Sequence, residues 1–132
     1  MATPVLQRIT GFWRSLRGDD VALAIANQLM NYQSGLVGSA TASAAGGTKC
    51  ALGINQFDTV GASSTATLPP YQLGAKCVVI NNTATNALTI YPYESTTTIN
   101  ALSAGSTFSL ATGKTIEFYC GKAGKWFGNL SA

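Results

Sequence analysis

The sequence predicts an all-β fold, a β-sandwich of the jelly-roll kind, preceded by a short N-terminal arm that is helical or extended. Three observations support this prediction. Beyond residue 47 the chain breaks into short runs in which apolar and polar residues alternate, as they do in half-buried strands. Turn-forming residues separate these runs at regular intervals. The chain has 132 residues, which suffices for one domain with its own core.

Residues 1–35 form the predicted N-terminal docking arm, which holds all the arginines of the chain. Large apolar residues recur there at spacings of three and four, as on one stripe of a helix. A helix this short is unstable alone in water, so we expect a partner to cover the stripe. The predicted interface residues are Ile9, Phe12, Trp13 and Leu16. Further along, residues 21–30 fit a helix or a strand equally well.

Residues 36–47 are the predicted linker, because the part from Gly38 to Gly47 contains only glycine, alanine, serine and threonine. Such a segment either extends freely or packs against a neighbour. Residues 48–132 form the predicted β-sandwich domain. Its expected strands are Thr48–Ile54, Ser63–Leu68, Lys76–Asn81, Ala87–Tyr93, Thr96–Leu102, Thr107–Leu110, Thr115–Gly121 and Lys125–Asn129.

The composition is poor in the residues that carry chemistry. Histidine is absent, and the five acidic residues, of which Asp19 and Asp20 are adjacent, are spread along the chain without a catalytic carboxylate pair. No nucleophile has a neighbouring base, and no glycine-rich phosphate loop is present. We therefore expect a protein that is not an enzyme and that has no catalytic residues, no metal ligands and no cofactor. The three cysteines lie in apolar runs and are expected to be reduced thiols of the core, with a disulfide as the alternative.

Charge and hydropathy limit the partners. Charged residues make up 10% of the chain, against about 25% in an ordinary soluble domain, so the surface repels neighbours weakly. This favours a protein that lives in an assembly. The eight basic residues form no run, and no apolar stretch approaches the length of a membrane span. We expect neither nucleic acid nor membrane as a partner, and synthesis in the cytoplasm.

A series of motifs fills the last two thirds of the chain. They read A-L-x-I-Y-P at 87–92, I-N-A-L at 99–102, G-K-x-x-x-F-Y at 113–119 and G-K-W at 124–126. In this order they resemble a small β-domain of tailed-bacteriophage virion structural proteins. The resemblance implies a homotrimer and a place on the virion, on the capsid surface rather than the tail. It implies a capsid decoration, or cement, protein that binds the major capsid protein or another virion protein and stabilises the head shell.

Other functions stay open at the level of sequence. The same type of β-domain occurs in tail, fibre and baseplate components. A carbohydrate-binding module is a further alternative, in which stacking faces would come from Tyr71, Tyr91, Tyr93, Trp126 and Phe127. The arginines and apolar residues of the arm also fit a helix on a membrane surface.

Overall fold

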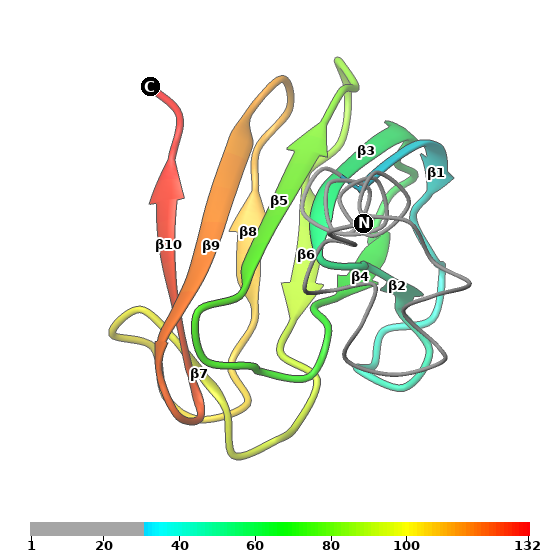
Figure 1. The fold of residues 1–132 in the computed structure, drawn as a ribbon. Coiled ribbons are helices and arrows are strands. Elements are labelled where there is room, and N and C mark those ends of the chain that lie inside the picture. The colour runs from blue at the N-terminus through cyan, green and yellow to red at the C-terminus, as the bar shows by residue number, and fades with distance from the viewer. Residues whose placement is uncertain (1–30) are drawn as a thin grey trace, which may run out of the picture. The chain divides into compact units, whose positions relative to one another are not determined.

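The structure, a computed structural model, describes residues 31–132, which are built entirely from strands and the turns between them (Figure 1). The all-β class predicted from the sequence is confirmed for this part of the chain. The predicted interface residues Ile9, Phe12, Trp13 and Leu16 lie outside the described residues. No helix among residues 31–132 could span a lipid bilayer.

Ten strands form two sheets, which lie as two layers in Figure 1. The six-stranded sheet has the order β1 (Tyr32–Val37), β3 (Gly53–Thr59), β5 (Lys76–Asn81), β9 (Thr115–Lys122), β10 (Lys125–Leu130) and β7 (Thr98–Ile99). The four-stranded sheet has the order β2 (Thr48–Lys49), β4 (Thr65–Thr67), β6 (Leu88–Tyr91) and β8 (Phe108–Leu110). The chain alternates between the sheets from β1 to β9.

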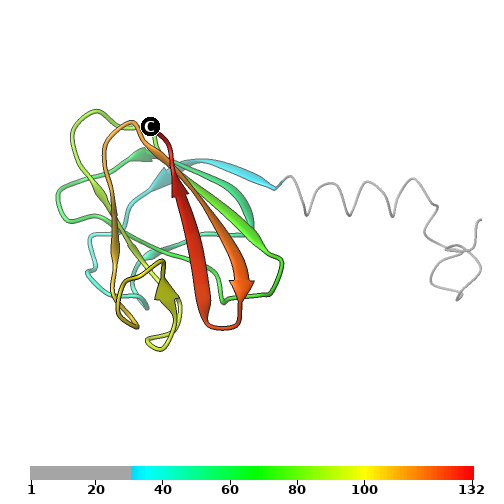
Figure 2. The ribbon, with the colours of Figure 1, turned by 90° about the vertical axis from the view of Figure 1, so that its left-hand side faces the viewer.

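This alternation winds the first half of the domain into a solenoid-like coil. Strands β1, β3 and β5 are parallel neighbours in one sheet, and β2, β4 and β6 are parallel neighbours in the other. The second half is different, because β8 and β9 return antiparallel to β6 and β5, and β10 forms a hairpin with β9 (Figure 2). The expected jelly roll would be antiparallel throughout. The structure differs because each early strand crosses to the opposite layer instead of turning back on its neighbour.

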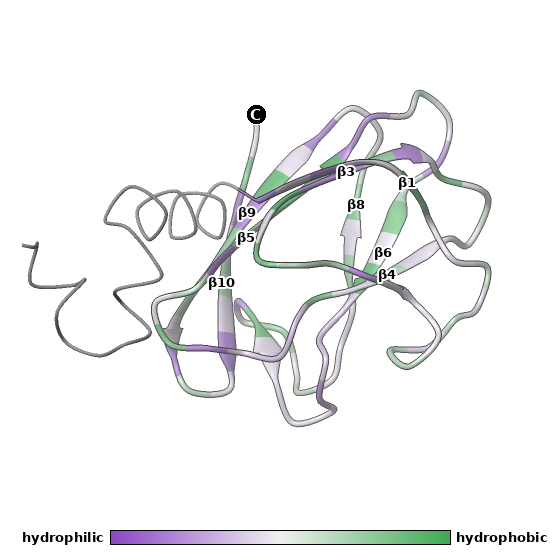
Figure 3. Ribbon diagram, turned by 45° about the vertical axis from the view of Figure 1, so that its right-hand side comes forward, coloured by the Kyte–Doolittle hydropathy of each residue, from purple (hydrophilic) through white to green (hydrophobic). Residues whose placement is uncertain are grey.

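The core is one continuous cluster of buried side chains from both sheets. Apolar and polar residues alternate along the strands, as the colouring of Figure 3 shows, so that one face of each sheet is apolar. On β9, Ile116 and Phe118 are fully buried, while Glu117 between them is not. Trp126 packs edge-on against Phe118, with ring centroids 6.5 Å apart. This inner packing fixes which side chains of β9 and β10 point outward.

Two buried asparagines join the coil to its turns. Asn55 Nδ2 donates to the carbonyls of Ala51 and Val78 at 2.8 and 3.1 Å. Asn81 Nδ2 likewise donates to the carbonyls of Asn86 and Leu110, at 2.9 and 3.1 Å. Because these buried amides have partners, they stabilise the turns instead of destabilising the core.

Strand β1 lies across the junction of the predicted arm and linker, ahead of residue 48, where the β-domain was expected to begin. The compact unit begins at Tyr32, and Tyr32 pairs with Ile54 of β3. Gly35 has a φ of 70°, and the pairing register of β1 with β3 shifts around it. The N–H of Gly35 donates to Asp58 Oδ2 at 2.6 Å. The sequence Gln-Ser-Gly in this strand interrupts the apolar alternation, which explains why no strand was predicted there.

Residues 38–47, which we call the strap, pack on the outer face of β4. Thr65 Oγ1 donates to the carbonyl of Thr41 and Thr67 Oγ1 donates to that of Ala44, each at 2.6 Å. A Cβ atom placed on Gly47 would lie 2.4 Å from Thr67 Oγ1, which is closer than real contacts allow. The small residues of the predicted linker are therefore required by close packing. This packing also explains why all of β4 is buried.

Two other sequence predictions change in detail. The expected strand Thr48–Ile54 is two strands, β2 and β3, which lie in different sheets because the chain turns at residues 50–53. Gly53 has a φ of 99°, a backbone conformation that favours glycine. The expected strand Thr96–Leu102 shortens to β7, which has two residues.

Candidate partner-binding face

Eight of the ten exposed large apolar residues of residues 31–132 gather in two places, and the other two, Val37 and Leu130, lie at the ends of β1 and β10. The first is the outer face of the six-stranded sheet, which presents Tyr32, Ile54, Tyr119 and Phe127. The second is the set of turns that follow β4, β6 and β7, which present Tyr71, Leu73, Tyr93 and Leu102. The turns that follow β3, β5 and β8 present none. Exposed apolar side chains that cluster in this way are typical of contact surfaces.

We call the first group, with Lys76 and Glu117 among it, the aromatic face. Strand pairing brings its members together. Tyr119 of β9 lies opposite Lys76 of β5 on one side and Phe127 of β10 on the other. The rings of Tyr119 and Phe127 are 41% and 43% exposed, although the residues beside them in the sequence, Phe118 and Trp126, are fully buried. The face is therefore set by the period-two alternation of strands packed on a core.

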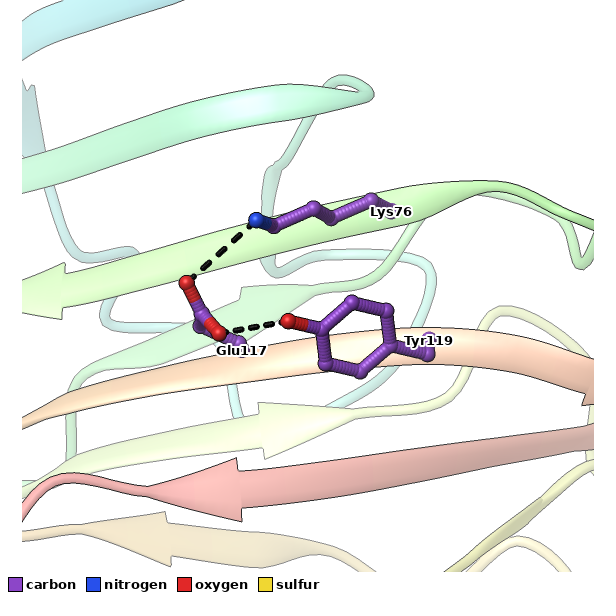
Figure 4. A network of polar contacts seen from close by, with 3 residues as sticks. All are labelled: Lys76, Glu117 and Tyr119. Atoms are coloured by element: carbon purple, nitrogen blue, oxygen red, sulfur yellow. Dashed lines mark hydrogen bonds and ion pairs between the residues drawn. The ribbon is translucent and has the colours of Figure 1, made fainter.

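A polar network lies at the centre of the aromatic face (Figure 4). Lys76 Nζ is 3.3 Å from Glu117 Oε1, and Tyr119 Oη donates to Glu117 Oε2 at 2.5 Å. Lys76 Nζ also lies 5.4 Å from the centroid of the Tyr119 ring. The carboxylate thus completes a network of one cation, one anion and one phenol on two neighbouring strands.

This network shifts the pKa of each member. The hydrogen bond from Tyr119, followed by that from Lys76, lowers the pKa of Glu117. The hydrogen bond with Glu117 and its negative charge raise the pKa of Lys76, and the same carboxylate raises the pKa of Tyr119. All three groups therefore keep the charge state that the network requires across the neutral pH range.

The rest of the face is also ordered by local contacts. Lys125 Nζ lies 5.0 Å from the centroid of the Phe127 ring. A Cβ on Gly121 would lie 3.7 Å from this ring, an ordinary van der Waals distance. Tyr32 Oη donates to Gln56 Oε1 at 3.1 Å. Rings restrained in this way lose little side-chain freedom when a partner covers them.

The face is broad and only slightly hollowed. A depression of about 220 Å³ adjoins it and is lined by Thr115, Glu117, Asn129, Leu130 and Ser131. Within residues 31–132 no cluster of three or more histidine, cysteine, aspartate or glutamate side chains could hold a metal ion. Cys50, Cys77 and Cys120 are buried free thiols, and a hydrogen bond with Cys50 together with burial raises the pKa of Cys77. The arrangement on this face suits contact with another protein surface.

The structure separates the aromatic residues that were candidates for sugar stacking. Trp126 is fully buried and belongs to the core, and Phe127 lies on the aromatic face. Tyr71 and Tyr93 lie on two different turns, and Tyr91 is a half-buried residue of β6. Together the five do not form one platform.

Sequence reasoning missed Tyr32, Ile54 and Tyr119 as surface residues of one face. The available signal was the position of Tyr119 between two buried residues, Phe118 and Cys120. Comparisons of the chain with protein-family models, with curated proteins and with solved structures find no match.

Proposed function

We propose that this protein is a structural component of a tailed-bacteriophage virion, a capsid decoration protein that forms homotrimers on the head shell. The observation that carries the proposal is the aromatic face, which leaves two large rings about two fifths exposed on an ordered sheet. Such a surface is typical of a contact between subunits. The motifs at residues 87–126, which resemble those of virion β-domains, support the same class.

The occupant that we propose for the aromatic face is a neighbouring copy of this chain. The face carries cations, Lys76 and Lys125, beside anions, Glu117 and Asp58. Around a three-fold axis this face of each copy contacts a different part of the next copy, and its mixed charges allow cations and anions to be opposed across that contact. The low overall charge of the chain, 10% of residues, also weakens repulsion between copies.

The attachment to the shell is proposed for the arm. Its apolar stripe, Ile9, Phe12, Trp13 and Leu16, would pack against the major capsid protein or another virion protein. Because the compact β-unit begins at Tyr32, residues 1–30 can be deleted without removing any part of β1. We expect the shortened chain to stay folded and to lose its binding to particles. Binding equal to that of the full chain would contradict the role of the arm.

For the fold we propose the sandwich expected of such virion domains, in which the two sheets enclose the core. The support is the single buried cluster to which both sheets contribute. This proposed sandwich lacks the strictly antiparallel strands of a jelly roll, because β1, β3 and β5 pair in parallel.

The function is tested by counting copies in purified particles. Quantitative mass spectrometry would measure this chain relative to the major capsid protein after gradient purification. We expect a fixed ratio set by the symmetry of the shell. A small number of copies, matching the symmetry of the tail, would replace the decoration role with the tail, fibre or baseplate role. Absence from the particles would overturn both.

The oligomer is tested by the solution mass of the full chain. We expect three times 13.6 kDa by analytical ultracentrifugation. Replacing Tyr119→Ser and Phe127→Ser together should shift the mass towards a single chain, because both apolar contacts are lost. A wild-type protein that remains at 13.6 kDa at all concentrations would overturn the trimer.

A further inference from the structure

A hollow of about 510 Å³ lies away from the aromatic face, where three segments meet. Its lining residues are Ala44, Ala45, Lys49, Tyr93 and Ser95. They come from the strap, from β2 and from the turn that follows β6, which runs along the lower end of the molecule in Figure 1. Its volume is within the range of small-molecule sites, about 300–1,000 Å³.

The hollow presents one aromatic ring and one cation. Pro92 ends β6, so Tyr93 leaves the sheet and its side chain is 48% exposed. Lys49 Nζ lies 5.8 Å from the centroid of the Tyr93 ring. The same ammonium donates to the carbonyl of Ala44 at 2.6 Å, which fixes it at the wall of the hollow. The small side chains of Ala44 and Ala45 leave the space in front of it open.

The charge of Lys49 has no carboxylate partner among residues 31–132, where the ion pair formed is Lys76–Glu117. Glu94 follows Tyr93 in the sequence but does not line the hollow. One of its oxygens, Oε2, accepts a hydrogen bond from Thr97 Oγ1 at 2.9 Å. An ammonium beside an open hollow with no anion at hand favours a negatively charged ligand.

We propose that this hollow binds an acidic saccharide, a pyranose ring that carries a carboxylate. The flat C–H face of the sugar would stack on the ring of Tyr93, and its carboxylate would pair with Lys49. The hydroxyl of Ser95 would bond a sugar hydroxyl. This site lies on the strap, β2 and a turn, away from the aromatic face, so it goes beyond the proposed virion role and does not depend on it.

The test is an NMR titration of the full chain with glucuronate, galacturonate and N-acetylneuraminate, each compared with its methyl ester. We expect the acids to shift the amide resonances of Ala44, Ala45 and Ser95 and the uncharged esters to bind more weakly. Tyr93→Ala should weaken binding of the acids about tenfold, since it removes the stacking face. Lys49→Gln should abolish the preference for the acid, and Lys49→Arg should retain it.

A matched control comes from the other lysine–tyrosine pair of the protein. Tyr119→Ala and Lys76→Gln change the same residue types on the aromatic face and should leave saccharide binding unchanged. The proposal is overturned if none of the three acids shifts the lining amides. It is equally overturned if acid and ester bind alike, or if the control variants weaken binding as much as Tyr93→Ala.

Discussion

Two pairs of the same residue types, Lys76–Tyr119 and Lys49–Tyr93, occupy different settings in this protein. The ammonium lies 5.4 Å from the ring centroid in the first pair and 5.8 Å in the second. The first pair lies on two neighbouring strands and is completed by Glu117, whereas the second joins Lys49 of β2 to Tyr93 of a turn beside a hollow. The surroundings of each lysine therefore decide its proposed role. A flat surface on which the lysine is paired with a carboxylate suits a protein partner, and an open hollow beside a lysine without such a partner suits a small anion.

The largest expected effect is a loss of unfolding free energy from a change in the core beneath the aromatic face. Trp126 is fully buried, so Trp126→Ala should cost about 3–5 kcal/mol of unfolding free energy through the cavity it leaves. Its neighbour Phe127 is 43% exposed, and Phe127→Ala should cost no more than about 1 kcal/mol. Urea denaturation of the chain without residues 1–30 measures both. Similar losses for the two variants would contradict the assignment of inner and outer faces.

The next largest effect is a loss of stability from a change in the packing of the strap on β4, beside the hollow. A Cβ on Gly47 would meet the Thr67 hydroxyl at 2.4 Å and the Ala66 backbone at 3.0 Å. We expect Gly47→Ala to cost about 1–3 kcal/mol by overpacking the strap. Gly61→Ala is the control, because its Cβ would lie 3.5 Å from Ser64 Oγ, an ordinary contact. Thermal unfolding compares the two, and equal midpoints would show that the strap does not pack closely.

A smaller effect concerns the edge of the aromatic face, where β1 carries Tyr32. Hydrogen bonds to Asp58, first from Asn82, then from Gln56 and Gly35, lower the pKa of its carboxyl. A lowered pKa contributes stability above the ordinary carboxyl value, and that stability is lost as the pH falls through the lowered value. Asp58→Ala should therefore increase amide exchange in β1 at neutral pH. Unchanged protection of β1 would contradict this role of Asp58.

The smallest expected effect concerns the pKa values in the network of Lys76, Glu117 and Tyr119. In Glu117→Gln, the pKa of Lys76 and that of Tyr119 should both fall towards their ordinary values, since the carboxylate raises them. Lys76 contributes to the stability of the folded state below its ordinary pKa, and this contribution is lost as the pH rises through the raised value. The variant should lack this contribution. NMR titration of Lys76 and ultraviolet titration of Tyr119 measure the shifts. Unchanged values would show that Glu117 does not complete the network.

The sequence predicted the parts of this fold that depend on local alternation. The inward positions of Ile116, Phe118 and Cys120 and the outward position of Glu117 follow from the period of two residues along the expected strand Thr115–Gly121. The order of strands could not be predicted, because the parallel pairing of β3 with β5 depends on where each connection crosses between layers. The residues of such short strands do not indicate whether a strand pairs parallel or antiparallel with its neighbour.

The candidate sites were harder to predict than the fold. Trp126 and Phe127 both looked like stacking residues, but adjacent residues of a strand point to opposite faces, and only packing on the core shows which one is buried. The hollow at Tyr93 needs residues from three segments, and the two from the strap, Ala44 and Ala45, were expected to belong to a linker. Contacts between segments distant in sequence leave no local pattern to read.

The most direct test of the central claim, that a second copy covers the aromatic face, is the accessibility of two introduced thiols. Asn129→Cys lies on the outer side of β10, and Ser109→Cys lies on β8 of the other sheet; both positions are exposed in a single chain. The native cysteines are buried, so a maleimide reports the introduced thiols. We predict that residue 129 is protected at high protein concentration and becomes reactive on dilution, while residue 109 reacts throughout. Equal and concentration-independent reaction at both positions would contradict the account.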